Sequence, residues 1–255
     1  MTANNGELGR QDESYYIVEA GPGARTYLGF KEDADVEEFV AETRRSEKDG
    51  RPVDYENYIY SVESKPGIQV MIPAGTIHAS GRNQVILEIG SLTVGSYTYK
   101  MYDYVRKDLD GNPRPIHTYH GDRVLKRGHK GRWVEENLIN GGKRSVRKGE
   151  DWEEFVVGEH ELLYFSLRNE RFVREIVDDT RGDFHVLALV DGEQVKICSR
   201  TNPDHFFLQN YMDIVVIPAD FGPYEIINMK PGTTCIEHKT MLKERTENTK
   251  DRGAE

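Results

Sequence analysis

The sequence predicts an all-β protein with a few short helices, built from two similar halves. Three observations lead to this fold class. Short runs of β-branched, aromatic and aliphatic residues recur along the chain, separated by Gly and Pro, which is typical of a sandwich or barrel. Helical spacing of apolar residues occurs in only two places. A strand-and-turn sequence is also repeated, because Val70–Ala74 reads VMIPA and Val215–Ala219 reads VVIPA.

The expected strands are short and numerous. In the first half they are Tyr15–Glu19, Thr26–Phe30, Gln69–Ile72, Val85–Ile89 and Tyr97–Met101. In the second half they are Glu161–Leu167, His185–Val190, Val195–Ile197, Asp213–Ile217 and Thr233–His238. Many short strands with turns between them favour antiparallel sheets over a parallel sheet covered by helices.

Two segments are expected to be helical. Asp35–Arg45 begins with acidic residues and places apolar side chains at helical spacing in the sequence VEEFV. Trp133–Ile139 is shorter and is followed by the sequence NGG, which is a stop signal.

The polar stretch Lys143–Asp151 marks the expected boundary between the two halves. We therefore expect a first domain over residues 1–125, a helical linker over 126–150 and a second domain over 151–243. The remaining residues, 244–255, lack large apolar side chains and are expected to be disordered.

Composition narrows the possible functions. The net charge of −10 argues against a nucleic-acid surface, which needs concentrated Lys and Arg. No apolar run approaches the roughly 18 residues that a membrane span needs, and the N-terminus lacks the features of a secretory signal. Cys198 and Cys235 are far apart and have no CxxC spacing, which favours reduced thiols in the cytoplasm, with a single disulfide as the alternative.

One histidine lies in a sequence context that suggests a site. The turn PAGT at residues 73–76 places His78 at the start of the following strand. In the second VxIPA segment the corresponding position is Pro223, so only the first half keeps this candidate ligand. An isolated histidine is more often a buried, hydrogen-bonded residue than a metal ligand, and a metal would need further imidazoles or carboxylates.

The segment Val70–Arg106, continuing to Leu125, resembles the type I phosphomannose isomerases, which are zinc-dependent members of the cupin superfamily. The shared motifs are IPAGTIHA, the EI strand, TYKMYD and LDGNPRPIH, in this order. Upstream, Gly6–Phe30 resembles the family's strand with a ligating glutamate and the hairpin after it. The resemblance implies two cupin-like jelly-roll domains and a cytoplasmic enzyme.

The resemblance also implies roles for individual residues. Glu13 and His78 would be ligands of one zinc ion, although Glu13 could equally be a solvated carboxylate at a strand edge. Glu88 would face the metal or point outward, and Lys100 would contact the sugar or lie on the surface. These two are the candidates for the catalytic acid or base. Arg10 would bind the substrate phosphate in place of the lysine common in the family.

The ligand set implied by the resemblance is incomplete. The family's Gln-Val-His-Pro motif would precede residue 1, and the sequence contains no QxH or HP. Three explanations remain open: the chain is a fragment, a second chain or upstream segment completes the site, or this is a degenerate relative.

The implied reaction interconverts mannose 6-phosphate and fructose 6-phosphate through a zinc-stabilised enediolate. The alternative is a non-catalytic or truncated cupin that binds a sugar or depends on a partner. A cupin iron oxygenase would need two histidines and a carboxylate, and the usual HxH pair is absent.

Overall fold

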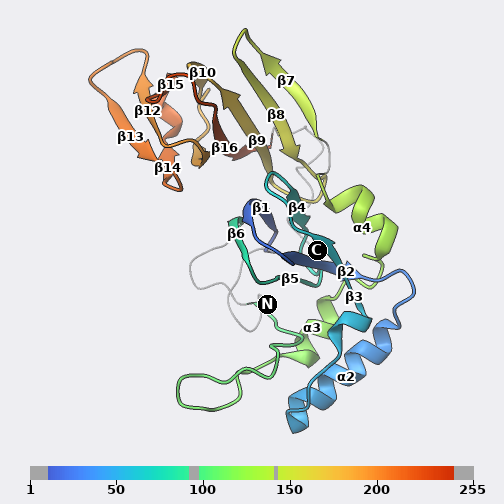
Figure 1. Ribbon diagram of the computed structural model, residues 1–255. Helices are drawn as coiled ribbons and strands as arrows, with labels where there is room; N and C mark the ends of the chain where they lie inside the picture. The colour runs from blue at the N-terminus through green and yellow to red at the C-terminus, as the bar shows by residue number, and fades with distance from the viewer. Residues whose placement is uncertain (1–10, 92–97, 141–142, 244–255) are drawn as a thin grey trace. The chain divides into compact units, whose positions relative to one another are not determined.

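The computed structural model describes residues 11–91, 98–140 and 143–243. The chain forms two compact units, which divide between Ile139 and Asn140 (Figure 1). Most of the described residues outside turns and loops lie in strands, so the predicted all-β fold class with a few short helices is confirmed. Arg10 and the expected disordered tail, residues 244–255, lie outside the described residues.

The first unit contains two three-stranded antiparallel sheets. Their strands are β1 (Glu13–Ala20), β2 (Arg25–Phe30), β3 (Ile59–Glu63), β4 (Gln69–Ile72), β5 (His78–Ser80) and β6 (Gln84–Gly90). One sheet has the order β4-β1-β6 and the other has the order β3-β2-β5. The helices are α2 (Val36–Asp49), α3 (Thr118–Val124) and α4 (Gly131–Leu138), with a short 3₁₀ helix at Tyr55–Asn57.

Helix α2 is determined by its two caps and its apolar stripe. The Asp35 carboxylate accepts hydrogen bonds from the backbone N–H groups of Glu37 and Glu38, both at 3.0 Å. At the other end, Gly50 adopts a left-handed conformation with φ of 72° and ends the helix. Because this stop signal lies beyond Arg45, the helix ends four residues later than the sequence predicts. Its apolar stripe packs into a core of eight buried residues: Phe30, Ala34, Val36, Phe39, Val40, Val53, Ile59 and Met101.

Several predicted elements differ from the observed ones. Of the predicted strand Tyr97–Met101, the first residue lies outside the described residues, and residues 98–101 form no strand. The predicted strand at Glu161 begins only at Phe165. The linker expected over 126–150 contains α4 and also a strand, β7 (Arg144–Lys148). Strand β7 has little apolar periodicity because it is an edge strand whose side chains are mostly exposed.

The second unit is a two-sheet structure. Its remaining strands are β8 (Trp152–Gly158), β9 (Phe165–Phe172), β10 (Glu175–Asp179), β11 (His185–Asp191), β12 (Gln194–Ser199), β13 (Phe206–Asn210), β14 (Ile214–Ile217), β15 (Pro223–Asn228) and β16 (Cys235–Leu242), with a 3₁₀ helix at Ala219–Phe221. The sheets have the orders β14-β11-β16-β9-β8-β7 and β10-β15-β12-β13.

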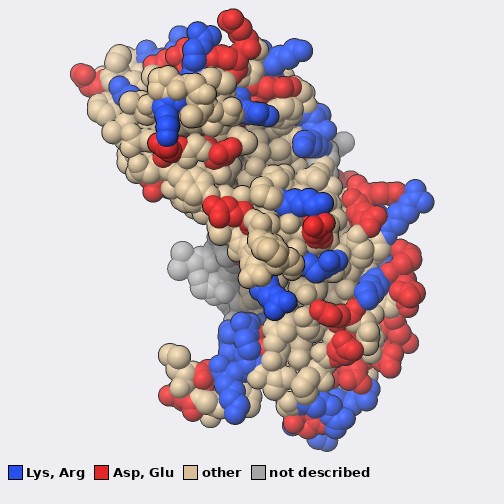
Figure 2. Space-filling view, in the orientation of Figure 1, with Lys and Arg blue, Asp and Glu red and all other residues tan. Residues whose placement is uncertain are grey.

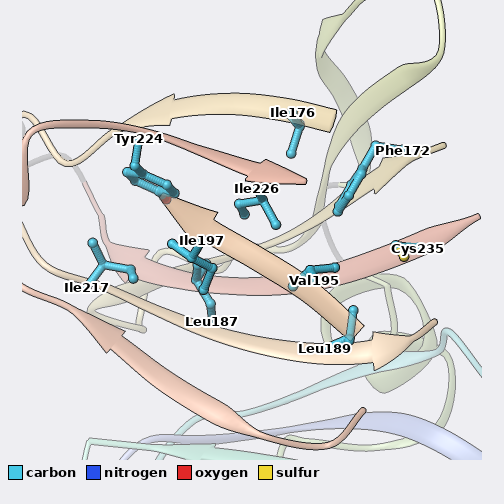
Figure 3. Close-up of a cluster of buried hydrophobic side chains, with 10 residues drawn as sticks. All are labelled: Phe172, Ile176, Leu187, Leu189, Val195, Ile197, Ile217, Tyr224, Ile226 and Cys235. Carbon is cyan, nitrogen blue, oxygen red and sulfur yellow. The ribbon is translucent and has the colours of Figure 1, made fainter. Parts of the chain in front are cut away.

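Ten buried side chains from both sheets form the core of this second unit (Figure 3). Successive strands contribute alternate residues, for example Leu187 with Leu189, and Val195 with Ile197. This period of two places one face of each strand in the core. Both cysteines are buried and free, so they do not form the disulfide that the sequence left open.

The repeated VxIPA segments occupy equivalent places in the two units. Each forms the end of a strand, β4 in the first unit and β14 in the second, and each is followed by a turn. The next strand then begins at His78 in the first unit and at Pro223 in the second. The two halves are therefore similar in local structure as well as in sequence at this point. The second unit has a proline where the first has a candidate ligand.

Charged side chains are distributed over the surface. On the face shown in Figure 2, Lys and Arg side chains are interspersed with Asp and Glu side chains over both units. Within the described residues, no helix is long and apolar enough to cross a membrane.

Candidate active site

The first unit brings Glu13 and His78 together, although 65 residues separate them in the sequence. Glu13 begins β1 in one sheet and His78 begins β5 in the other sheet. The His78 Nε2 and Glu13 Oε2 atoms are 3.0 Å apart. The Tyr15 ring contacts the His78 ring edge-on, with the ring centres 5.8 Å apart. The two sheets therefore meet through the residues that the sequence comparison had singled out.

The hydrogen bonds of His78 determine which ring nitrogen carries a proton. Its Nδ1 lies 2.9 Å from the carbonyl oxygen of Thr76. A carbonyl oxygen can only accept, so Nδ1 must donate. The other nitrogen, Nε2, then faces the Glu13 carboxylate, which is also an acceptor. A proton, carried by the imidazole or by the carboxyl group, must therefore lie between the two atoms, unless a cation takes its place.

Electrostatics agree with this arrangement. Burial alone would lower the pKa of His78, but the Glu13 carboxylate and the Thr76 carbonyl outweigh it and the pKa is raised. One imidazole nitrogen and one carboxylate oxygen, both aimed at the same position, are donors that zinc prefers. The second nitrogen of His78 is held by a carbonyl, as is usual for a histidine ligand. These two residues fit a zinc ion.

Glu88 lies on the same face of the sheet as Glu13. It is the neighbour of Tyr15 across the β1–β6 pair, and Tyr15 follows Glu13 by two residues. The Glu88 side chain is exposed, yet partial burial and the Glu13 carboxylate raise its pKa. Glu88 thus has an exposed side chain near the Glu13 carboxylate, and its role at the site stays a prediction.

Tyr15 completes this face. Burial, with the Glu88 and Glu13 carboxylates, raises the pKa of its phenol. The phenol therefore remains neutral at physiological pH and can donate a hydrogen bond.

Three supporting residues escaped the sequence analysis. The Gln11 amide donates to Glu13 Oε1. Asp12 is fully buried, and its Oδ1 accepts from the backbone N–H of Ala74 at 2.9 Å. The Thr76 hydroxyl contacts His129. Asp12 and the isolated His129 gave no signal in the sequence, because their contacts join segments distant in sequence.

Lys100 lies in a different environment. Its Nζ is 3.3 Å from Asp103, which also pairs with Arg106 and with Arg114 Nε at 3.1 Å. Burial would raise the pKa of Asp103, but Arg106 and Lys100 lower it overall. The contacts among the described residues do not join Lys100 to Glu13, His78 or Glu88. The structure thus separates the candidate site residues into a carboxylate–imidazole group and a cationic group.

The described residues supply only part of a metal site. Within them, no group of three or more His, Cys, Asp or Glu side chains is arranged to hold a metal ion. The Glu13–His78 pair therefore offers two such ligands.

Comparison with known proteins identifies the relationship. No family model matches the chain. Over 122 residues the sequence is 33% identical to the mannose-6-phosphate isomerase ManA of Bacillus subtilis (strain 168), covering 48% of this chain and 35% of ManA. Over 217 residues it is 27% identical to YvyI of the same organism, which carries that enzyme name provisionally. The chain is therefore similar in sequence to mannose-6-phosphate isomerases over part of their length.

Solved structures support the same fold. The mannose 6-phosphate isomerase of Bacillus subtilis has a TM-score of 0.70 at 19% identity, covering 94% of this chain and 67% of that chain. A Bacillus subtilis oxalate decarboxylase variant reaches 0.53 at 10% identity, with 94% and 65% covered. A zinc-bound mannose 6-phosphate isomerase reaches 0.54 at 10% identity, with 92% and 66% covered. The cupin-like fold expected from the sequence is thereby confirmed.

The match to YvyI covers 81% of this chain but only 60% of YvyI. The chain therefore spans less than two thirds of the curated relatives that it matches.

Proposed function

We propose that this chain takes part in the isomerisation of mannose 6-phosphate and fructose 6-phosphate, with Glu13 and His78 as zinc ligands. The observation that carries the proposal is the close approach of these two side chains, whose Nε2 and Oε2 atoms lie 3.0 Å apart. The names of the sequence relatives support the reaction, and a zinc-bound structural neighbour supports the metal.

A bound zinc ion would supply a Lewis acid that polarises the substrate's carbonyl and hydroxyl oxygens. The chain's own residues would orient the zinc ligands and transfer a proton. Glu13 and His78 hold fixed orientations through Gln11 and the Thr76 carbonyl. Glu88, with its raised pKa, is the proposed acid or base that moves the proton between C1 and C2 of the sugar.

Phosphate binding needs positive charge. Lys100, Arg106 and Arg114 share a single carboxylate, Asp103, which leaves this cluster with two uncompensated positive charges. Such a cluster suits a phosphate. We propose that Lys100 contacts the substrate from this cluster, and that Arg10 is an additional phosphate ligand.

A zinc site with catalytic function usually has three protein ligands and an open position. We propose that an upstream segment or a second chain completes the ligand set of this chain. A non-catalytic sugar-binding module is the second candidate, favoured by the two-ligand set among the described residues.

The test is a coupled assay on mannose 6-phosphate with and without added Zn²⁺. It is performed on this chain alone and on the chain joined to the upstream segment of ManA. Glu13→Gln and His78→Gln should each lower turnover by at least ~100-fold, since they remove ligands. The matched control is Glu63→Gln, an exposed carboxylate at the end of β3, which should leave turnover unchanged.

The outcomes separate the two candidates. Turnover that requires zinc and is lost in both ligand variants supports the isomerase. Saturable binding of mannose 6-phosphate by calorimetry, without turnover in either form, supports the sugar-binding module. Absence of both contradicts both.

A further inference from the structure

The turn that carries His78 is held by a residue more than 50 positions downstream. Thr76 is buried, and its hydroxyl oxygen lies 2.6 Å from the Pro73 carbonyl and 2.8 Å from His129 Nδ1. The carbonyl can only accept, so the Thr76 hydroxyl donates its single proton there. The contact with His129 therefore requires that Nδ1 carry a proton and donate to the hydroxyl oxygen.

Further contacts hold His129 and its neighbours against the first unit's sheet. The backbone N–H of Lys126 donates to the Gly75 carbonyl at 2.9 Å. The backbone N–H of Phe30 donates to the His129 carbonyl at 2.8 Å. The His129 ring stacks on Trp133 of α4, with ring centres 4.4 Å apart. His129 therefore has a fixed backbone and a fixed ring plane, as a residue that orients another must have.

Thr76 transmits this constraint to His78. Its hydroxyl is held by His129, and its carbonyl accepts from His78 Nδ1 at 2.9 Å. Rotation of the Thr76 peptide would break the contact that aims His78 Nε2 at Glu13. Asp12, the residue before Glu13, accepts a hydrogen bond from the backbone N–H of Ala74 in the same turn. The turn is thus anchored from both directions in the sequence.

We infer that His129 is a positioning residue, which orients His78 through Thr76. The expected effect of His129 on zinc binding rests on the proposed function. The orientation of the His78 ring itself does not depend on it. Partners that orient a ligating histidine typically contribute a factor of about 10 to 100 in metal affinity.

Two substitutions distinguish the contribution of the His129 ring from that of its N–H group. His129→Phe keeps a ring that can stack on Trp133 but removes the donor. His129→Asn keeps an N–H donor near the position of Nδ1 but removes the stacked ring. A positioning role predicts that His129→Phe disturbs the orientation of the His78 ring and weakens zinc binding. It also predicts that His129→Asn largely preserves both. A role in packing alone predicts the opposite order.

The first readout is NMR of the metal-free protein. The Cδ2–H and Cε1–H resonances of His78, assigned with His78→Gln, are sensitive to the neighbouring Tyr15 ring. They should shift in His129→Phe and stay near the wild-type positions in His129→Asn. Unchanged His78 resonances in folded His129→Phe, or equal shifts in both variants, would overturn the inference.

The second readout is zinc affinity, measured by competition with a chromophoric chelator. We expect a loss of about 10- to 100-fold in His129→Phe and less than about 3-fold in His129→Asn. If wild-type protein binds no zinc, the metal assignment in the proposed function fails while the NMR result still decides the role of His129.

Thr76→Val covers the case in which His129→Phe does not fold, and a double-mutant cycle is added where both fold. Thr76→Val removes the same hydrogen bond at nearly constant volume and should shift the His78 resonances in the same way. Where both singles fold, the double variant should bind zinc no more weakly than either one, because all three remove the same link. Fully additive losses, or Thr76→Val with unshifted His78 resonances, would contradict the inference.

Discussion

At the scale of single residues, the site depends on which polar atoms can donate and which can only accept. His78 lies between a carbonyl and a carboxylate, and Thr76 lies between a carbonyl and His129. This fixes a proton on Nδ1 of His78 and directs the Thr76 hydroxyl proton to the Pro73 carbonyl. Asp12 follows the same rule, since its buried carboxylate accepts from the Ala74 N–H and links β1 to the turn.

Asp12→Ala should therefore destabilise the protein by about 1–3 kcal/mol, because it leaves the partly buried Ala74 N–H without this acceptor. Asp12→Asn keeps a side-chain oxygen at the same position and should cost less. Urea unfolding of both variants measures the difference. Equal losses would show that the charge of Asp12, and not its acceptor oxygen, is what matters.

A second residue-scale prediction concerns pH. His238 of β16 is fully buried, and burial lowers its pKa to about 3. In the unfolded chain a histidine has a pKa of about 6.5. Because the folded-state pKa is depressed, the stability linked to His238 is present above pH ~6.5 and is lost as the pH falls towards 3.

Compared with His238→Gln, the wild type should lose about 1 kcal/mol of unfolding free energy between pH 7 and pH 5.5. The comparison with the variant is needed because burial raises the pKa of Glu170 to about 7, which changes stability in the opposite direction over this range. Parallel pH profiles of the two proteins would contradict the assignment.

At the scale of elements, close contact between segments determines which residues a turn accepts. Gly75 has a φ of 87°, and a Cβ there would lie 2.4 Å from the Val124 carbonyl oxygen. Two features therefore disfavour a side chain at position 75 of the PAGT turn: the backbone conformation of the residue and the segment near Val124 that covers it.

Gly75→Ala should cost more than Gly23→Ala. Gly23 has a φ of 71° but open space where a Cβ would lie, so Ala there carries only the backbone strain of about 1–2 kcal/mol. At Gly75 the overlap adds about 1–3 kcal/mol. Thermal unfolding compares the two variants. Equal destabilisation would mean that the chain near Val124 can move aside freely.

The strands illustrate how far periodicity reaches. Runs of β-branched, aromatic and aliphatic residues correctly placed the strands at residues 15–19, 26–30, 69–72 and 185–190, since most of their side chains are buried. It missed β7, whose side chains are mostly exposed, and it predicted a strand at Tyr97–Met101 that the described residues 98–101 do not form. The spacing of apolar residues reflects which side chains are buried, so a strand with few buried side chains gives little signal in the sequence.

At the scale of the whole molecule, the two units share a strand-and-turn arrangement but differ in their interiors. In the second unit, Lys239 is buried and pairs with Glu154 at 2.9 Å, Glu170 at 2.5 Å and Asp178. These carboxylates come from three different strands, β8, β9 and β10. The ammonium therefore ties strands from both sheets of this unit together.

Lys239→Met should destabilise the second unit by about 3–5 kcal/mol, because Glu154, Glu170 and Asp178 would lose their buried ammonium and keep the partly exposed Arg147 as a shared partner. The control is Lys230→Met, which removes an exposed pair with Glu193 and should cost at most ~1 kcal/mol. Chemical denaturation followed by a probe in the second unit, such as Trp152, measures both. Similar small losses would show that the carboxylates find other partners.

The sequence by itself determined the all-β class, the two-fold repetition and the importance of His78, because each is written in local patterns: alternation, turn residues and a contiguous motif. The resemblance had already paired Glu13 with His78, but only the tertiary structure decided how closely they meet, that Glu88 shares their face, and that Asp12 and His129 hold the turn between them. Those contacts join segments tens of residues apart, so each depends on how two sheets and a distant loop pack together. No local pattern encodes that packing.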